Sequence, residues 1–242
     1  MMDAAAAIAR LDAADSLLVG LDFDGVLAEL VGRPEDARPV PGVPEVLHAL
    51  VASPGVRVAA VSGRRRADLA ARLSPPAGVI LIGEHGADPG IEELEIPDGY
   101  HDVRLALEAV AERFDGAWVE EKRTGLTIHG RALSEADAAD LTRRAEIALE
   151  SLVPGRYERG DRIVDVRLTG VTKGAAVSAL RSDDEVVLYV GDDTTDESVF
   201  EVLGAGDVGV KVGPGSTAAD CRLPNPAAVV GFLTELVGSR AR

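Results

Sequence analysis

Continuous apolar runs mark the two ends of the chain. Five short runs, all rich in valine, leucine or isoleucine, occupy residues 17–21, 56–61, 79–82, 186–190 and 207–212. Runs of this length without alternation predict strands buried on both faces, as in a parallel sheet. Helical spacing predicts the intervening helices at residues 3–11, 43–51, 65–73, 173–181, 196–203 and 226–237. The chain ends therefore predict an α/β fold with a Rossmann-like parallel-sheet core.

The middle of the chain has a different order of predicted elements. Helix, strand, strand occurs twice, with helices expected at 103–114 and 134–152 and strands at 117–121, 126–129, 157–159 and 163–168. Short alternating strands next to each other predict an antiparallel sheet. We expect an inserted α+β cap domain at residues 98–168, within a core built from residues 1–97 and 169–242.

Composition narrows the class of protein. The chain has 242 residues, 46% of them hydrophobic, and a formal net charge of −16. This charge argues against a nucleic-acid partner, and no apolar run approaches the roughly 20 residues that span a bilayer. The single cysteine cannot form an internal disulfide, and the start of the chain resembles a helix rather than a signal peptide. A cytoplasmic enzyme with a small-molecule substrate is expected; the oligomeric state is left open.

Two acidic clusters follow buried strands. Asp22 and Asp24 come after the run 17–21, with Gly25 turning the chain, and Asp192 opens a second cluster that extends to Asp196. Polar residues at the carboxyl ends of parallel strands lie where such sheets bind ligands. Because grouped carboxylates repel each other, they predict a hard divalent cation such as Mg²⁺, with Mn²⁺ and Co²⁺ as alternatives.

The same positions suit phosphate chemistry, although each has a structural alternative. One carboxylate can attack phosphorus and another can transfer protons, but Asp-Gly is also a common turn. Ser62 ends the run 56–61, and it could bind a phosphoryl oxygen or cap the next helix. Lys173 is one of only three lysines against 22 arginines, and it stands at a predicted helix start, where the dipole disfavours a cation. That position suggests a bridge between carboxylate and phosphate.

In order along the chain, these motifs resemble the haloacid dehalogenase superfamily and, within it, the trehalose-6-phosphate phosphatases. The matching stretches are Asp22-Phe-Asp-Gly-Val-Leu, Val61-Ser-Gly-Arg, Gly83-Glu-His-Gly, Gly170-Val-Thr-Lys-Gly, Gly191-Asp-Asp-Thr-Thr-Asp-Glu, Val210-Lys-Val-Gly and, in the expected cap, Trp118-Val-Glu-Glu-Lys with His129-Gly-Arg. The resemblance implies the haloacid dehalogenase fold.

Roles follow from this resemblance residue by residue. It implies Asp22 as nucleophile and Asp24 as general acid and base, with Ser62 and Lys173 holding the phosphoryl group. It also implies Mg²⁺ bound by Asp22, the backbone carbonyl of Asp24 and Asp192, with support from Asp196. The residues expected to contact substrate are Gly25, Arg64, Glu84, Glu120, Lys122 and Arg131.

The expected reaction is Mg²⁺-dependent hydrolysis of trehalose 6-phosphate through an aspartyl-phosphate. Two alternatives remain open from the sequence. The substrate could be another sugar phosphate, such as sucrose phosphate or a glycosyl-phosphoglycerate. More distantly, the chain could be a signalling module that keeps phosphate on an aspartate, although such modules are much shorter and lack a cap.

Overall fold

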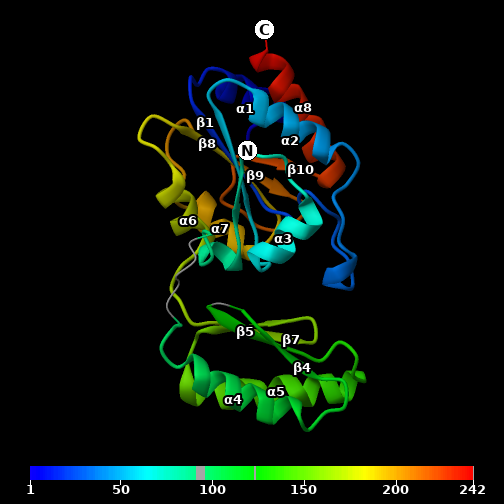
Figure 1. The fold of residues 1–242 in the computed structure, drawn as a ribbon. Coiled ribbons are helices and arrows are strands. Elements are labelled where there is room, and N and C mark those ends of the chain that lie inside the picture. The colour runs from blue at the N-terminus through cyan, green and yellow to red at the C-terminus, as the bar shows by residue number, and fades with distance from the viewer. Residues whose placement is uncertain (91–95, 123, 242) are drawn as a thin grey trace. The chain divides into compact units, whose positions relative to one another are not determined.

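The computed structural model describes residues 1–90, 96–122 and 124–241. The chain forms two compact units, Met1–Gly90 with Val171–Arg242 and, between them in sequence, Ile91–Gly170 (Figure 1). The cap expected at residues 98–168 lies within the second unit. Among the described residues, no helix combines the length and the apolar character needed to cross a membrane.

The first unit is built on a six-stranded sheet in which every neighbouring pair is parallel. The strands, in spatial order, are β10 (Cys221–Leu223), β9 (Val208–Val212), β8 (Val186–Gly191), β1 (Leu17–Leu21), β2 (Val56–Val61) and β3 (Val79–Ile82). This confirms the predicted parallel-sheet core. The strand β10 was not predicted, because three residues are too few for a hydrophobic pattern to be recognised.

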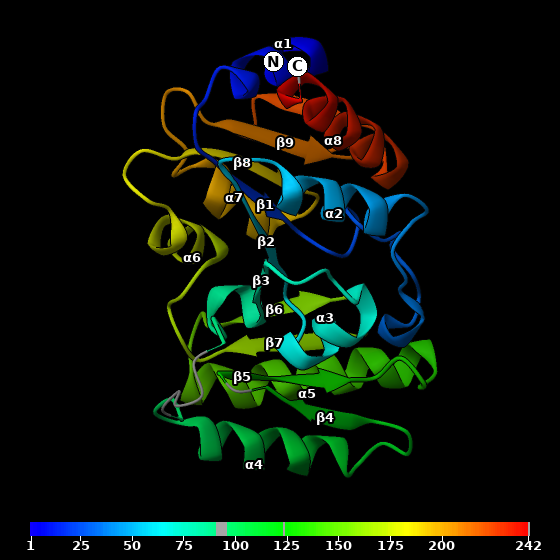
Figure 2. The same cartoon turned by 45° about the horizontal axis from the view of Figure 1, so that its top comes forward.

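Helices on both faces explain why the strands are continuously apolar. One face packs against α1 (Ala4–Asp12), α2 (Val43–Ala52), α3 (Arg66–Leu73) and α8 (Pro226–Arg240). The other packs against α6 (Lys173–Leu180) and α7 (Thr194–Phe200), as Figure 2 shows. Successive strand residues alternate between the two apolar clusters: Leu17 and Val19 belong to the first, and Leu18 to the second. Each strand therefore needs an apolar residue at almost every position.

The order of the strands brings the two acidic clusters together. The first strand, β1, lies between β2 and β8. The next strands in sequence, β2 and β3, extend the sheet on one side of β1, and the later strands β8, β9 and β10 extend it on the other. At its carboxyl end Leu21 is in register with Val190 of β8. The loops that begin at Asp22 and Asp192 therefore leave the sheet side by side, at the kind of switch point where open α/β sheets bind ligands.

The second unit has a four-stranded antiparallel sheet with two helices. The strands, in spatial order, are β4 (Trp118–Glu121), β5 (Gly125–His129), β7 (Ile163–Arg167) and β6 (Tyr157–Gly160). The helices α4 (Tyr100–Ala111) and α5 (Glu135–Leu152) cover one face of this sheet (Figure 1). Leu126, Ile128, Val164 and Val166 point from the sheet into the shared core. We call the opposite face the helix-free face.

Two helix starts differ from their predictions for local reasons. The helix expected from residue 103 begins at Tyr100, because Gly99 precedes it with a φ of 79° that favours glycine. The helix expected from residue 196 begins at Thr194, because the Asp193 side chain caps it. Two 3-10 turns, η1 (Pro34–Asp36) and η2 (Glu84–Gly86), were not predicted.

Candidate active site

Asp22 lies directly after β1 and is buried in the first unit, with 4% of its surface exposed. One carboxylate oxygen, Oδ1, accepts a hydrogen bond of 2.6 Å from the backbone N–H of Phe23. The other, Oδ2, accepts one of 2.6 Å from the ammonium of Lys173. The predicted nucleophile is therefore oriented by two donors at the switch point of the sheet.

Lys173 is the first residue of α6, as predicted, and its side chain is fully buried. Its Nζ also donates to Asp196 Oδ1 at 2.8 Å, so the ammonium bridges two carboxylates. Asp196 Oδ1 accepts a further hydrogen bond of 2.7 Å from the hydroxyl of Tyr189 in β8. The two carboxylates offset the unfavourable interaction between the Lys173 charge and the helix dipole, which explains why a lysine is tolerated at this helix start.

Asp196 organises the loop that carries Asp192. Its Oδ2 accepts from the backbone N–H groups of Asp192 and Asp193, at 2.9 and 3.0 Å. Together with Lys173 and Tyr189 this makes four donors, which is about the number that a carboxylate can accept. Asp193 accepts in turn from the backbone N–H of Asp196 at 3.3 Å and so completes a capping box. Asp196, which was predicted to support the metal, thus holds in place both Lys173 and the loop that begins at Asp192.

Four carboxylates gather here. One oxygen from each of Asp22, Asp192, Asp193 and Asp196 lies within 4.8 Å of the others. Asp193 was not among the predicted site residues. Gly25, at a φ of 74°, makes room for the cluster: a Cβ there would lie 2.0 Å from a carboxylate oxygen of Asp192. Glycine is required at this position by both conformation and space.

The electrostatics of the cluster fit a bound cation. Burial raises the pKa of Asp22, although Lys173 opposes this shift. Burial, and then the charges of Asp193 and Asp196, raise the pKa of Asp192 to about 7. These two carboxylates are therefore costly to keep ionised in the protein alone. An all-oxygen donor set of this kind suits a hard divalent cation.

The remaining charges are already balanced within the protein. Burial alone would lower the pKa of Lys173, but Asp22 and Asp196 raise it, so the lysine stays charged. Burial would raise the pKa of Asp193, yet Lys173 and hydrogen bonds from Thr195 hold it at about 2. Asp22 and Asp192 are consequently the best candidates for direct metal ligands.

The Asp24 side chain is not part of the four-carboxylate group and pairs with Arg64. The guanidinium donates from Nε to Asp24 Oδ2 and from Nη2 to Oδ1, both at 2.7 Å. Its Nη1 donates to Asp68 at 2.7 Å, and its Cζ lies 5.3 Å from the centre of the Phe23 ring. Arg64, which is also a predicted substrate contact, pairs here with the predicted acid and base. Bidentate pairs of this kind fix geometry well.

Ser62 and Glu84 stand at the ends of β2 and β3, respectively. The Ser62 Oγ accepts from the backbone N–H of Arg64 at 3.2 Å, and the helix that follows has Arg65 as its N-cap, so the capping alternative for Ser62 is wrong. The backbone carbonyl of Ser62 accepts from the N–H of His85 at 3.0 Å. Glu84 and His85 both have positive φ, 50° and 56°. Such strain in consecutive residues other than glycine is typical of functional sites.

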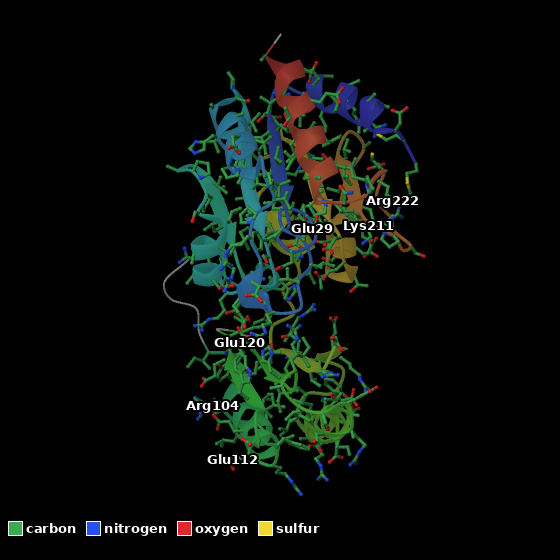
Figure 3. All side chains as sticks on the ribbon, turned by 90° about the vertical axis from the view of Figure 1, so that its right-hand side faces the viewer. Glu29, Arg104, Glu112, Glu120, Lys211 and Arg222 are labelled. Carbon is green, nitrogen blue, oxygen red and sulfur yellow. The ribbon has the colours of Figure 1, made fainter. Side chains whose placement is uncertain are left out.

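Lys211 is a further residue at this edge that the prediction missed. It lies in β9, is 4% exposed, and its ammonium donates to the backbone carbonyl of Asp192. Arg222 of β10 is its register partner and donates to the carbonyl of Gly215 at 2.7 Å (Figure 3). The scarcity of lysine was the signal that could have identified Lys211. It anchors the Asp192 loop from the neighbouring strand.

The helix-free face of the second sheet carries the predicted cap residues Glu120 and Lys122. Lys122 donates to Asp165 at 2.6 Å, and Glu120 lies 3.1 Å from His129 Nε2. The hydrogen bond with His129, despite opposing burial, lowers the pKa of Glu120. Glu120 lies on the other side of this unit from Arg104 of α4 and from Glu112, which directly follows α4 (Figure 3). Arg131 follows β5 in an exposed turn.

Comparison with known proteins identifies what this chain is similar to. The sequence model of the trehalose-phosphatase family matches residues 20–220. The bifunctional trehalose-6-phosphate synthase/phosphatase of Thermoproteus tenax is 34% identical, over 90% of this chain and 32% of that one. The trehalose-phosphate phosphatase of Mycobacterium avium is 31% identical, over 93% of this chain and 63% of that one. The chain thus spans less than two thirds of these relatives.

The fold has close counterparts among solved structures. The C-terminal domain of the Candida albicans trehalose-6-phosphate phosphatase aligns with a TM-score of 0.79 at 23% identity, covering 97% of this chain and 96% of that one. At this identity the likeness concerns the fold alone. It confirms the haloacid dehalogenase type of fold that the motifs implied.

Proposed function

The chain belongs to the trehalose-phosphatase family, and on that basis we propose that it hydrolyses trehalose 6-phosphate to trehalose and inorganic phosphate. The observation that carries this proposal is the buried contact between Lys173 and Asp22, 2.6 Å long, inside a group of four carboxylates. An oriented carboxylate next to a fixed positive charge is suited to attack a phosphate monoester and to stabilise the transferring group.

In the first step, an oxygen of Asp22 forms a bond to phosphorus as the bond from phosphorus to the sugar oxygen breaks. The departing sugar oxygen takes a proton from Asp24. In the second step, Asp24 takes a proton from water, and that water attacks phosphorus and releases Asp22. For both transfers, Asp24 has to exchange a contact with Arg64 for one with the reacting oxygen.

The other predicted core residues bind and orient the phosphoryl group. Lys173 already donates toward Asp22, and Ser62 lies buried at the end of the neighbouring strand. Mg²⁺ would be held by Asp22, Asp192 and the backbone carbonyl of Asp24, with Asp196 fixing the loop. Bound there, it would supply positive charge that stabilises the transition state.

The second unit acts in this proposal as the specificity cap. Glu120, Lys122 and Arg131 are charged groups that can hydrogen-bond sugar hydroxyls. Glu120 lies in β4 in register with Thr127, and Thr127 is in register with Asp165 of β7. Lys122 directly follows β4, and its ammonium reaches Asp165 on this same face. A disaccharide, with hydroxyls on two rings, can use several such groups at once.

Phosphate release tests the proposal directly. The protein is incubated with trehalose 6-phosphate, sucrose 6-phosphate and glucose 6-phosphate, each with Mg²⁺ and with EDTA. Selective, metal-dependent release from the trehalose ester is expected. Release from the other esters alone would keep the mechanism and overturn the substrate. A phosphoprotein that persists for minutes without release would instead favour the signalling alternative.

A further inference from the structure

Trp118 is an unusual feature of the helix-free face. It is the only tryptophan in the chain, and 53% of its surface is exposed although indole is a large apolar group. It lies at the first position of β4, in register with His129 of β5 and on the same side of the strand as Glu120. An exposed aromatic ring beside charged groups is typical of a binding surface.

The ring of Trp118 is held in a defined orientation. It stacks on the imidazole of His129 with 4.1 Å between ring centres and 5° between their planes. His129 is itself 8% exposed, and its Nε2 lies 3.1 Å from Glu120. One face of the indole is therefore covered by a fixed neighbour, and the exposed area belongs to the remainder of the ring. The platform exists before any ligand binds, which lowers the entropic cost of using it.

The chemistry of this surface matches a sugar ring. A pyranose presents C–H groups on its faces and hydroxyls around its edge. An aromatic plane can cover the first, while charged neighbours such as Glu120 and Lys122 can bind the second. An isolated apolar partner would leave these charged groups without a role in the complex, and a fully polar ligand would leave the indole exposed.

We propose that Trp118 is a specificity residue of the phosphatase reaction, whose indole packs against a pyranose ring of the substrate. The proposal rests on the function proposed above. Because Trp118 binds the sugar rather than the phosphate, it contributes to substrate and product binding alike. Its loss raises KM and leaves kcat nearly unchanged, as expected for an interaction that is equal in the ground and transition states.

The intrinsic fluorescence of the unmodified protein provides the first test. With a single tryptophan, the emission reports on this position alone. Titration with trehalose in the presence of Mg²⁺ should change the emission saturably, since sugar binding removes water from the indole. The same concentrations of glycerol serve as the control. No change at trehalose concentrations that inhibit phosphate release from trehalose 6-phosphate would overturn the proposal.

Variants provide the second test. We expect Trp118→Ala to raise KM for trehalose 6-phosphate by about tenfold, the effect of losing one well-packed aromatic contact. Trp118→Phe should recover part of that loss. Leu105→Ala removes another exposed apolar side chain of the same unit, 57% exposed on α4, and should leave KM unchanged. A Trp118→Ala protein with unchanged KM would contradict the role assigned to the indole.

The two proposals fail in different ways. If trehalose 6-phosphate releases no phosphate but another sugar phosphate does, the proposed substrate is wrong, and both tests are repeated with the ester that reacts. An emission change and a raised KM with that ester would then support Trp118 as a sugar platform. If trehalose 6-phosphate does react and neither measurement responds to Trp118, the proposed function stands and this inference falls.

Discussion

Two lysines, one in each unit, make the same contact in different surroundings. Lys173 binds Asp22 and Lys122 binds Asp165, and in both pairs Nζ lies 2.6 Å from a carboxylate oxygen. Lys173 is 1% exposed and has Asp196 as a second partner, whereas Lys122 is 13% exposed. The two ammonium–carboxylate contacts are thus chemically identical, and they differ in how deeply the lysine is buried and in how many partners it has.

The difference indicates how the two units contribute to function. In the core, Lys173 and Asp196 are each fixed by several partners, as the four donors to Asp196 illustrate. A preorganised group of this kind stabilises a transition state without rearranging. On the helix-free face, Lys122 keeps some contact with solvent, so exchanging its carboxylate for a sugar hydroxyl should cost less than it would at Lys173. Under the proposed function, the core would carry the chemistry and the cap would select the sugar.

The most drastic way to separate these roles is Asp22→Asn. Asparagine keeps the shape and a hydrogen bond to Lys173 but removes the nucleophile, so turnover should fall by on the order of 10⁴-fold or more. Steady-state phosphate release measures this loss. The cap should not respond, so trehalose should still change the Trp118 emission. Circular dichroism confirms the fold, and turnover retained in this variant would rule out the covalent mechanism.

The lysine pair itself gives the next largest effect. Lys173→Met leaves two buried carboxylates without their cation, and breaking a buried pair in this way costs about 3–5 kcal/mol of unfolding free energy. Lys122→Met should cost less, about 1 kcal/mol, because its pair is only partly buried, yet it should raise KM for the disaccharide ester. Urea unfolding of both variants measures the contrast.

The outcome of this comparison is easy to interpret. Equal losses of stability in the two variants would show that burial does not separate the units. If Lys173→Met does not fold, Lys173→Arg provides the alternative: it keeps the charge, should fold, and should lose turnover because guanidinium geometry differs from that of an ammonium.

Much of the core site was predictable because a strong hydrophobic pattern marks where the strands lie in the sequence. Five continuous apolar runs give five parallel strands, and side chains just beyond their ends must meet, as Asp22 and Asp192 do. Lys173 was found through its conflict with the helix dipole. These inferences needed only local sequence and one general property of parallel sheets.

The rest depended on contacts that local sequence does not record. Tyr189 reads as an ordinary core residue of β8, and only the fold shows that its hydroxyl reaches Asp196. From the sequence Arg64 could equally have faced substrate, and only the tertiary structure shows that it pairs with Asp24. Asp193 was given no role, since a capping box is hard to distinguish from an acidic helix start when the helix boundary is misplaced.

A pH effect should appear in the core and not in the cap. With the pKa of Asp192 raised to about 7, the metal-free protein carries a proton there below pH 7. Mg²⁺ must displace this proton, so its affinity should fall by about tenfold per pH unit below 7. Calorimetry at pH 6 and pH 8, in buffers with different ionisation enthalpies, measures both the affinity and the released proton.

The same shift predicts the stability of the metal-free protein. Between about pH 4 and pH 7 the folded state holds a proton on Asp192 that the unfolded state has lost, so this group makes unfolding easier as the pH rises. Asp193, with its pKa held at about 2, acts only at lower pH. The Asp192→Asn variant should lose the proton release between pH 6 and pH 8; release that persists in it would assign the proton elsewhere.

The smallest expected effect tests the comparison with one hydroxyl in each unit. Tyr189 donates to Asp196 in the core and Tyr157 donates to Glu150 in the cap, both at 2.7 Å. Tyr189 is buried and makes an edge contact with Phe200, whereas the Tyr157 hydrogen bond is exposed. Replacing each tyrosine by phenylalanine therefore removes the same bond from two environments.

We expect Tyr189→Phe to lower the unfolding free energy by about 1–3 kcal/mol, because Asp196 is left with an unmet acceptor site in a buried position. Looser placement of Lys173 should lower kcat by a few-fold and leave KM unchanged. Tyr157→Phe should change neither quantity measurably, since water replaces its hydroxyl. A kcat for Tyr189→Phe equal to that of the unmodified protein would mean that Asp196 positions Lys173 without this hydroxyl. The residues that preorganise the core would then include Asp196 and Lys173 but not Tyr189.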